Sequence, residues 1–126
     1  MKTTKNLRNA GFTLVEIMIV VAIIGLLAAI AIPNFVKARA TSQANACINN
    51  LRQIDAAENQ WALEKGHTTG WTAPTLTSDL TPYIKLNSAG NIPPCPAGGT
   101  YNTFTVGATP QVTCTLSGAN PGHFLP

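Results

Sequence analysis

Apolar residues are concentrated near the N-terminus of the chain. Between Phe12 and Ile32 the only polar side chains are those of Thr13 and Glu16. A helix over this stretch would be about 31 Å long, which is enough to cross the apolar core of a bilayer. The pattern therefore predicts a membrane-spanning helix over residues 12–33. A plain membrane anchor or a cleaved secretory signal peptide would show a similar run.

A helical pattern continues after the apolar run. Beyond Pro33, apolar residues recur at spacings near three and four, as on one face of a helix. These residues are Ala44, Cys47, Ile48, Leu51, Ile54, Trp61 and Ala62. Lys65 followed by Gly66 is typical of a helix C-terminus. We therefore expect the helix to continue over residues 34–65, with this apolar face packed against the rest of the chain.

Residues 66–126 are polar and rich in Gly and Pro, and we expect them to form a small head. Two segments, 101–106 and 111–116, have the composition of strands, and Gly107 to Pro110 between them is a turn signal. A two-stranded hairpin needs support, which the long helix can provide. The predicted fold class is therefore α+β, a long N-terminal helix packed against a head with a β-hairpin.

The net charge of +3 comes from the first eleven residues, which contain Lys2, Lys5 and Arg8. Basic and acidic residues cancel in the rest of the chain, so the body gives no reason to expect nucleic-acid binding. Positive charges on one side of a membrane helix favour a cytoplasmic N-terminus. A membrane-anchored, exported binding module for DNA or a surface ligand remains an alternative function of a different class.

The junction of the basic leader and the apolar run resembles a known processing site. The segment Gly11-Phe12-Thr13-Leu14-Val15-Glu16 is similar to the cleavage site of type IV prepilins and type II secretion pseudopilins, and the similarity extends through residues 17–33. A basic leader, Gly-Phe, the Glu and the later Pro all occur in register. The resemblance implies a type IV pilin-like fold and a structural subunit of a type IV pilus or pilus-like filament. The alternative is the major pseudopilin of a type II secretion system.

The resemblance also implies how the chain is processed. Prepilin peptidase would cut between Gly11 and Phe12, remove the leader at residues 1–11, and N-methylate the new Phe12 amine. Glu16 lies one helical turn later, inside the apolar run, where an unpaired carboxylate is costly. In the family, this Glu pairs with the Phe12 amine of a neighbouring subunit and sets the register of assembly. The alternative is that Glu16 interacts only with its own amine or with lipid headgroups.

Two residues are expected to weaken the long helix. Pro33 lacks an N–H group and should kink or loosen it, and Gly25 has a low helix propensity. By resemblance, the stretch from Gly25 to Pro33 can lose helicity and give the assembled subunit axial stretch. A kink without a function is the alternative.

The resemblance implies several partners and a location. The partners are prepilin peptidase, identical and related subunits in a helical homopolymer, an inner-membrane assembly platform and membrane lipid. The subunit would cross the inner membrane once, with a cytoplasmic N-terminus and a periplasmic or extracellular head. It would then enter an extracellular or periplasmic filament. This role is structural, so we expect neither enzymatic activity nor a cofactor.

The chain has three cysteines, and an odd count leaves one thiol free or bonded to another chain. The segment from Cys95 to Tyr101, with Cys114 and His123, resembles the C-terminal pattern of many short prepilin-like proteins. We expect a Cys95–Cys114 disulfide, which would close a loop of about 20 residues and contribute about 3 kcal/mol. Two buried thiols are the alternative. Cys47 lies on the apolar helix face and is expected to be a small core residue.

Other chemistry is not indicated by the sequence. His67 and His123 are expected to be surface or packing residues, and there is no local Cys/His spacing for zinc. Some secretion pseudopilins bind calcium through acidic side chains in a C-terminal loop, but here no Asp or Glu follows Asp79. We therefore expect no metal site.

Overall fold

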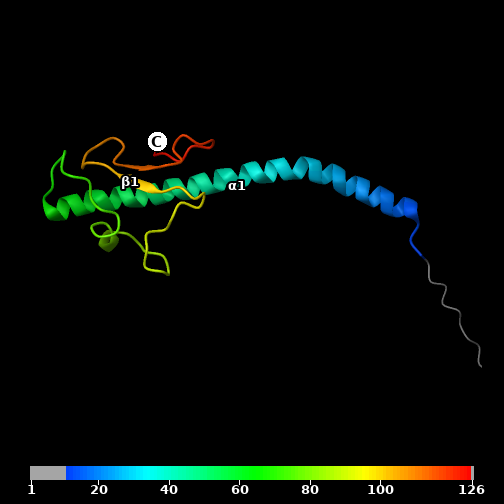
Figure 1. Cartoon of the computed structure of the whole chain (residues 1–126), viewed down its shortest axis with the longest axis horizontal. Helices are drawn as coiled ribbons and strands as arrows, with labels where there is room; N and C mark the ends of the chain where they lie inside the picture. Colours follow the sequence, from blue (N-terminus) through cyan, green and yellow to red (C-terminus); the bar gives the residue numbers. More distant parts are fainter. Residues whose placement is uncertain (1–10, 126) are drawn as a thin grey trace, which may run out of the picture. The chain divides into compact units, whose positions relative to one another are not determined.

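The computed structural model describes residues 11–125 of the chain, so most of the predicted leader lies outside the described residues. In chain order it contains helix α1 (Leu14–Lys65), a 3₁₀ helix η1 (Thr81–Tyr83), strand β1 (Tyr101–Thr103) and strand β2 (Val112–Cys114), as Figure 1 shows. The predicted α+β class is confirmed. The chain divides into two compact units, one ending at Lys37 and the other beginning at Ala38. Each unit is described by itself.

The first unit consists mainly of the N-terminal part of α1, whose apolar side chains are exposed. The most apolar 18-residue window of α1 has a mean hydropathy of 2.9, and none of it is buried. By length and composition, this is the one helix among the described residues that could cross a membrane. Pro33 lies inside α1 and does not end it. A loss of helicity between Gly25 and Pro33 in an assembled state stays a prediction.

The C-terminus of α1 is closed by hydrogen bonds around a glycine. Gly66 has a φ of +70°, in the left-handed region that glycine adopts without strain. The Gly66 N–H donates to the Leu63 carbonyl (3.3 Å), and the His67 N–H donates to the Ala62 carbonyl (2.8 Å). These two bonds form a Schellman motif, which satisfies carbonyls left free at the helix end. The predicted end at Lys65 is therefore confirmed.

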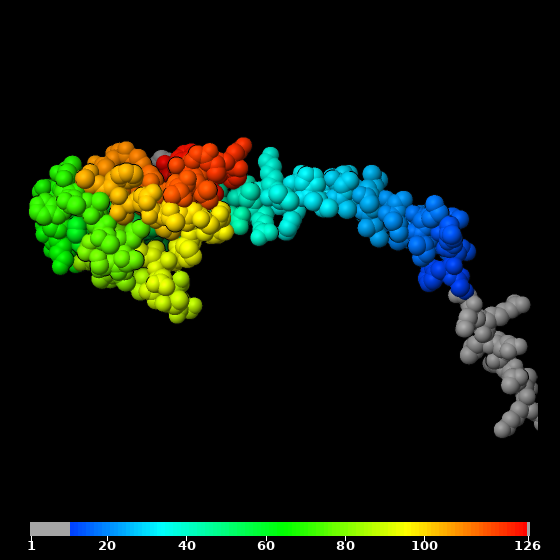
Figure 2. Space-filling view, viewed as in Figure 1, coloured from blue at the N-terminus to red at the C-terminus, as the bar shows by residue number. Residues whose placement is uncertain are grey.

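The core of the second unit is built on one face of α1. The residues of α1 that are buried there are Ala44, Cys47, Leu51, Ile54, Ala57, Glu58, Trp61 and Ala62. All of them except Ala44 and Glu58 belong to one core cluster with buried residues of the head, namely Leu80, Ile84, Cys95, Val106, Val112 and Cys114. Figure 2 shows the loops that follow the helix, green to red, lying over its C-terminal part. The predicted packing face is confirmed.

The hairpin is shorter than the sequence predicts. Strands β1 and β2 are antiparallel, with Tyr101 opposite Cys114 and Thr103 opposite Val112. Beyond them, the backbone of Val106 pairs with another segment, because it donates to the Trp71 carbonyl (3.1 Å) and accepts from the Gly70 N–H (2.8 Å). The predicted strand over residues 101–106 therefore ends early, since its last residue is used to fasten the loop that follows α1.

One carboxyl group lies in the core without a hydrogen-bond partner. Glu58 is fully buried on α1, and neither of its carboxylate oxygens has a partner among the described residues. Burial, with the nearby charge of Asp55, raises the pKa of Glu58 from 4.5 to about 7. The protonated, neutral form is therefore favoured in the folded state, as expected for a carboxyl group that has lost its water.

The Glu58 carboxyl group predicts a pH-dependent stability. Its folded pKa is the higher one, so between pH 4.5 and about 7 the folded state binds more protons than the unfolded state. The stability that this group contributes at low pH is therefore lost as the pH rises through this window, and its total is on the order of 3 kcal/mol. We expect Glu58→Gln to flatten this dependence. Unfolding of the full chain in detergent, measured from pH 4.5 to 7.5, tests this; an unchanged slope in the variant would contradict it.

Gly99 gives a second prediction. A Cβ placed there would lie 2.6 Å from Cys114 Sγ and 3.1 Å from Leu116 Cγ, both inside contact distance. We expect Gly99→Ala to destabilise the head by about 1–3 kcal/mol through overcrowding. Gly118→Ala is the matched control, because a Cβ at Gly118 meets nothing within 4 Å and the residue has no positive φ. Chemical unfolding of both variants decides; equal stabilities would refute the packing argument.

Candidate functional site

The predicted processing site lies just before the start of α1. Gly11 and Phe12 precede the helix, which begins at Leu14 rather than at Phe12 as the sequence suggested. Phe12 is 86% exposed, and a Cβ at Gly11 would meet nothing within 4 Å. Exposed, non-helical backbone is the kind of segment that proteases reach most easily. The Gly11–Phe12 bond is therefore accessible in this structure.

Thr13 and Glu16 explain why the helix starts where it does. The Glu16 N–H donates to Thr13 Oγ1 (3.2 Å), while the Thr13 N–H and hydroxyl both donate to Glu16 Oε2 (2.8 Å each). This reciprocal arrangement is a capping box, which satisfies donors that the first turn leaves free. The Thr-x-x-Glu signal was present in the sequence and was overlooked. The Glu16 carboxylate is thus held by Thr13.

A second group of side chains with metal-binding chemistry lies in the core of the second unit. Cys47 comes from α1, Cys95 from the loop before β1, Cys114 from the end of β2 and His123 from the C-terminal segment. All four are buried, and their ligand atoms lie within 4.8 Å of one another. Cys95 Sγ and His123 Nδ1 are 3.4 Å apart. We call these four residues the Cys/His cluster.

Sequence reasoning missed the Cys/His cluster. Cys47 was expected in the core and His123 as a surface or packing residue, and both are indeed buried. No local motif joins the four residues, because 48, 19 and 9 positions separate them in turn. The only sequence signal was that Cys47 lies on the apolar face of α1, while the other three residues lie in segments expected to pack against that face.

The pKa values of the Cys47 and Cys95 thiols are shifted in opposite directions. Burial, with hydrogen bonds involving Cys95 and Cys114, raises the pKa of the Cys47 thiol to about 12. Burial acts in the same direction on Cys95. There, however, hydrogen bonds from the backbone of Ala97 and Gly99, with contributions from Cys47 and His123, outweigh it and lower the pKa to about 7. The surroundings of Cys95 therefore favour its thiolate form, whereas those of Cys47 favour its thiol.

The three cysteines are free thiols in this structure. The Cys95–Cys114 disulfide therefore stays a prediction. Both sulfurs are also close to Cys47 Sγ, so proximity does not single out one pair.

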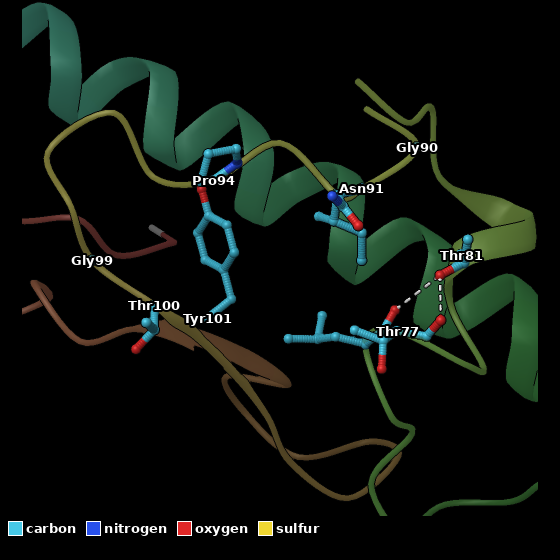
Figure 3. A pocket seen from close by; sticks show the side chains of 10 residues that line it. Thr77, Thr81, Gly90, Asn91, Pro94, Gly99, Thr100 and Tyr101 are labelled. Carbon is cyan, nitrogen blue, oxygen red and sulfur yellow. Dashed lines mark hydrogen bonds between the residues drawn. The ribbon is translucent and has the colours of Figure 1, made fainter. Parts of the chain in front are cut away.

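The head also carries an open pocket of about 450 Å³, shown in Figure 3. Its wall includes the apolar side chains of Leu76, Ile92 and Tyr101. The Thr81 hydroxyl lies at one end and donates to the Thr77 carbonyl (2.7 Å). The lining contains no charged side chain and combines apolar side chains with those of Thr and Asn residues.

His67 has a packing role that the sequence predicted. Its ring stacks on Trp71 with centroids 4.4 Å apart and contacts Trp61 at 4.5 Å. These three aromatic side chains fasten the loop after α1 to the end of the helix.

Comparisons with known proteins bear on the N-terminal site. A family described as the prokaryotic N-terminal methylation motif matches residues 6–32. The type IV major pilin protein PilA of Myxococcus xanthus is 55% identical over 60 residues, which is 48% of this chain and 27% of that protein. The type IV major fimbrial protein FimA of Dichelobacter nodosus is 44% identical over 80% of this chain and 66% of its own length. No solved structure matches the chain.

A secretion protein is also similar. The type II secretion system core protein G of Escherichia coli is 30% identical over 102 residues, covering 75% of this chain and 70% of that protein. The chain thus spans about a quarter of the Myxococcus pilin and about two thirds of the others. Three observations point to the same family. They are the methylation motif, the long helix α1 and the similarity over most of the chain. The chain belongs to the family of type IV pilins and type II secretion pseudopilins.

Proposed function

We propose that the chain is a prepilin, the structural subunit of a type IV pilus or pilus-like filament. The observation that carries the proposal is the coincidence of the methylation motif at residues 6–32 with the exposed Gly11–Phe12 bond and the capped start of α1. Relatives over most of the chain are named as major fimbrial and secretion core proteins, which are structural names.

Maturation would take place at the N-terminal site. Prepilin peptidase would remove residues 1–11 and methylate the Phe12 amine. Both steps need access to the backbone around Phe12, and the exposure of Gly11 and Phe12 supports this. The capping box lies on the far side of the cut, so α1 keeps its N-terminal hydrogen bonds after cleavage.

The exposed apolar part of α1 supports both membrane storage and assembly. A fully exposed apolar helix is unfavourable in water and needs an apolar environment on every side. We propose that residues 12–33 span the inner membrane before assembly and form the filament core afterwards. Residues 34–65 would continue the helix into the head, residues 66–126. Lipid, the assembly platform and neighbouring subunits would be the successive partners, with the head periplasmic or extracellular.

Glu16 would act in assembly through its charge. Both contacts from Thr13 go to the same oxygen, Oε2, so the carboxylate keeps a second oxygen that can accept from another donor. We propose that this donor is the Phe12 amine of a neighbouring subunit. A paired carboxylate is far less costly in an apolar filament core than an unpaired one, so the contact would fix the axial register.

The major pseudopilin of a type II secretion system is the second candidate. The similarity to the Escherichia coli core protein G, which extends over most of both chains, favours this candidate. Deleting the gene separates the two functions. Loss of surface filaments with normal protein export supports the pilus, and loss of export supports the secretion system.

Maturation is tested by mass spectrometry of the protein recovered from its native host. We expect an N-terminal peptide that begins with N-methylated Phe12. Gly11→Val should block the cut and leave the leader attached, while Gly118→Ala, which changes a glycine in the head, should mature normally. A mature protein that begins after Ala31 would show instead that the apolar run is an ordinary signal peptide.

The role of Glu16 is tested by Glu16→Gln. Glutamine can also close a capping box, so this variant removes the charge and retains the cap. We expect normal cleavage and a fall in filament number of about tenfold or more, measured by electron microscopy. Thr13→Val is the matched control, because it removes the two hydroxyl contacts of the cap and retains the charge. Filament numbers that fall in Thr13→Val but not in Glu16→Gln would mean that the cap, and not the charge, matters.

A further inference from the structure

The Cys/His cluster gathers four metal-binding side chains from four separate segments. Helix α1, the loop before β1, the end of β2 and the C-terminal segment contribute one residue each. The four residues range from 0% to 4% exposed. Three thiols and an imidazole in so small a volume form one of the common ligand sets of structural zinc.

The distances within the Cys/His cluster fit a tetrahedral ion. With Zn–S of about 2.3 Å and Zn–N of about 2.0–2.1 Å, tetrahedral ligands place two sulfurs about 3.8 Å apart and a sulfur and a nitrogen about 3.5 Å apart. The separation of Cys95 Sγ and His123 Nδ1 is 3.4 Å, and no pair in the cluster exceeds 4.8 Å. A contraction of about 1 Å at the longest separation therefore completes the tetrahedron.

The surroundings supply hydrogen-bond donors to the sulfurs. Backbone N–H groups of Ala97 and Gly99 point to Cys95 Sγ. The Tyr101 hydroxyl, which accepts from Asn50 Nδ2 (3.0 Å), also interacts with Cys47. Donors of this kind stabilise thiolates and orient the ligands around a metal.

Gly99 leaves space for the third sulfur. A Cβ at this position would lie 2.6 Å from Cys114 Sγ, so any side chain there would displace the thiol. The backbone from Cys95 to Gly99 thus holds one ligand and makes room for another. This is the close approach of backbone to a site for which glycine is used.

A disulfide explains the Cys/His cluster less well. Bonding any two of the sulfurs leaves the third thiol and the His123 ring buried without a role. One ion uses all four groups and accounts for the odd number of cysteines. It also joins the head to α1 at Cys47, and a head whose described part has two strands of three residues each needs such a cross-link.

We propose that Cys47, Cys95, Cys114 and His123 bind one zinc ion in a closed, structural site that fastens the head to α1. Binding forms three Zn–S bonds and one Zn–N bond. It releases to solvent the protons of those cysteines that are still thiols, with no change in oxidation state. The proposed zinc site does not depend on whether the chain serves a pilus or a secretion pseudopilus.

The test uses the full chain in detergent, stripped of metal and reduced. Zinc sulfate should bind at one ion per chain and raise the unfolding temperature by about 10 °C when it is present at about 100 times its Kd. Cobalt chloride should give the visible absorption bands of tetrahedral Co²⁺ and the ultraviolet charge-transfer bands of thiolate ligation. Competition by zinc should abolish both signals.

Variants identify the ligands. Cys47→Ser and His123→Gln should each weaken zinc binding by about 100-fold or more, and His123→Cys should restore it through a four-cysteine site. His67→Gln is the matched control, since His67 stacks between Trp61 and Trp71 away from the Cys/His cluster, and it should bind zinc normally. If a ligand variant fails to fold, the cobalt spectrum of the unaltered chain still decides between thiolate ligation and none.

The native state of the cysteines gives an independent measurement. Protein isolated without reductant should contain about one zinc ion per chain and three free thiols. Isolation of a metal-free chain with a Cys95–Cys114 disulfide would overturn the proposal. So would a reduced chain that shows no thiolate bands with cobalt, or a His123→Gln variant that binds zinc as tightly as the unaltered chain.

Discussion

The fold of the second unit depends on the burial of one face of α1. Among the described residues, its head contains only η1 and two strands of three residues each, too little regular structure to hold a core alone. The head therefore packs on the helix, where side chains from Cys47 to Ala62 provide the surface on which Leu80, Ile84 and Val112 are buried. Removing this helix face would leave the head without its largest apolar partner.

At its N-terminal end, the same helix has apolar side chains that the described residues leave exposed. Its first half is apolar on all sides and uncovered, so it is stable only in lipid or among other apolar helices. Its second half has one apolar stripe and polar residues elsewhere, as expected for a helix that lies against a small domain. The change of pattern along a single element allows one subunit to use it first as an anchor and then, in the proposed filament, as an assembly surface.

The polar groups buried in the core of the second unit differ in how well they are hydrogen-bonded. Glu58 lies in the core with neither oxygen bonded, so it lowers stability when charged. The Cys/His cluster has mutual contacts and backbone donors, so its polar atoms are supported by their neighbours. Gln111 takes an intermediate position, since its side-chain amide can donate to Asp55 and accept from the Gly107 N–H. A core of this polarity specifies its packing through particular partners rather than through apolar contact alone.

The sequence by itself determined the long helix, its end at Lys65, the buried stripe and the family, because each depends on local periodicity, capping or a contiguous motif. It also contained the Thr-x-x-Glu signal of the capping box at Thr13 and Glu16, although the sequence-based expectations did not include it. The tertiary structure alone decided the early end of β1 and the meeting of Cys47, Cys95, Cys114 and His123. Those features join residues far apart in the chain, and their proximity follows from how the loops pack on α1, which no local pattern encodes.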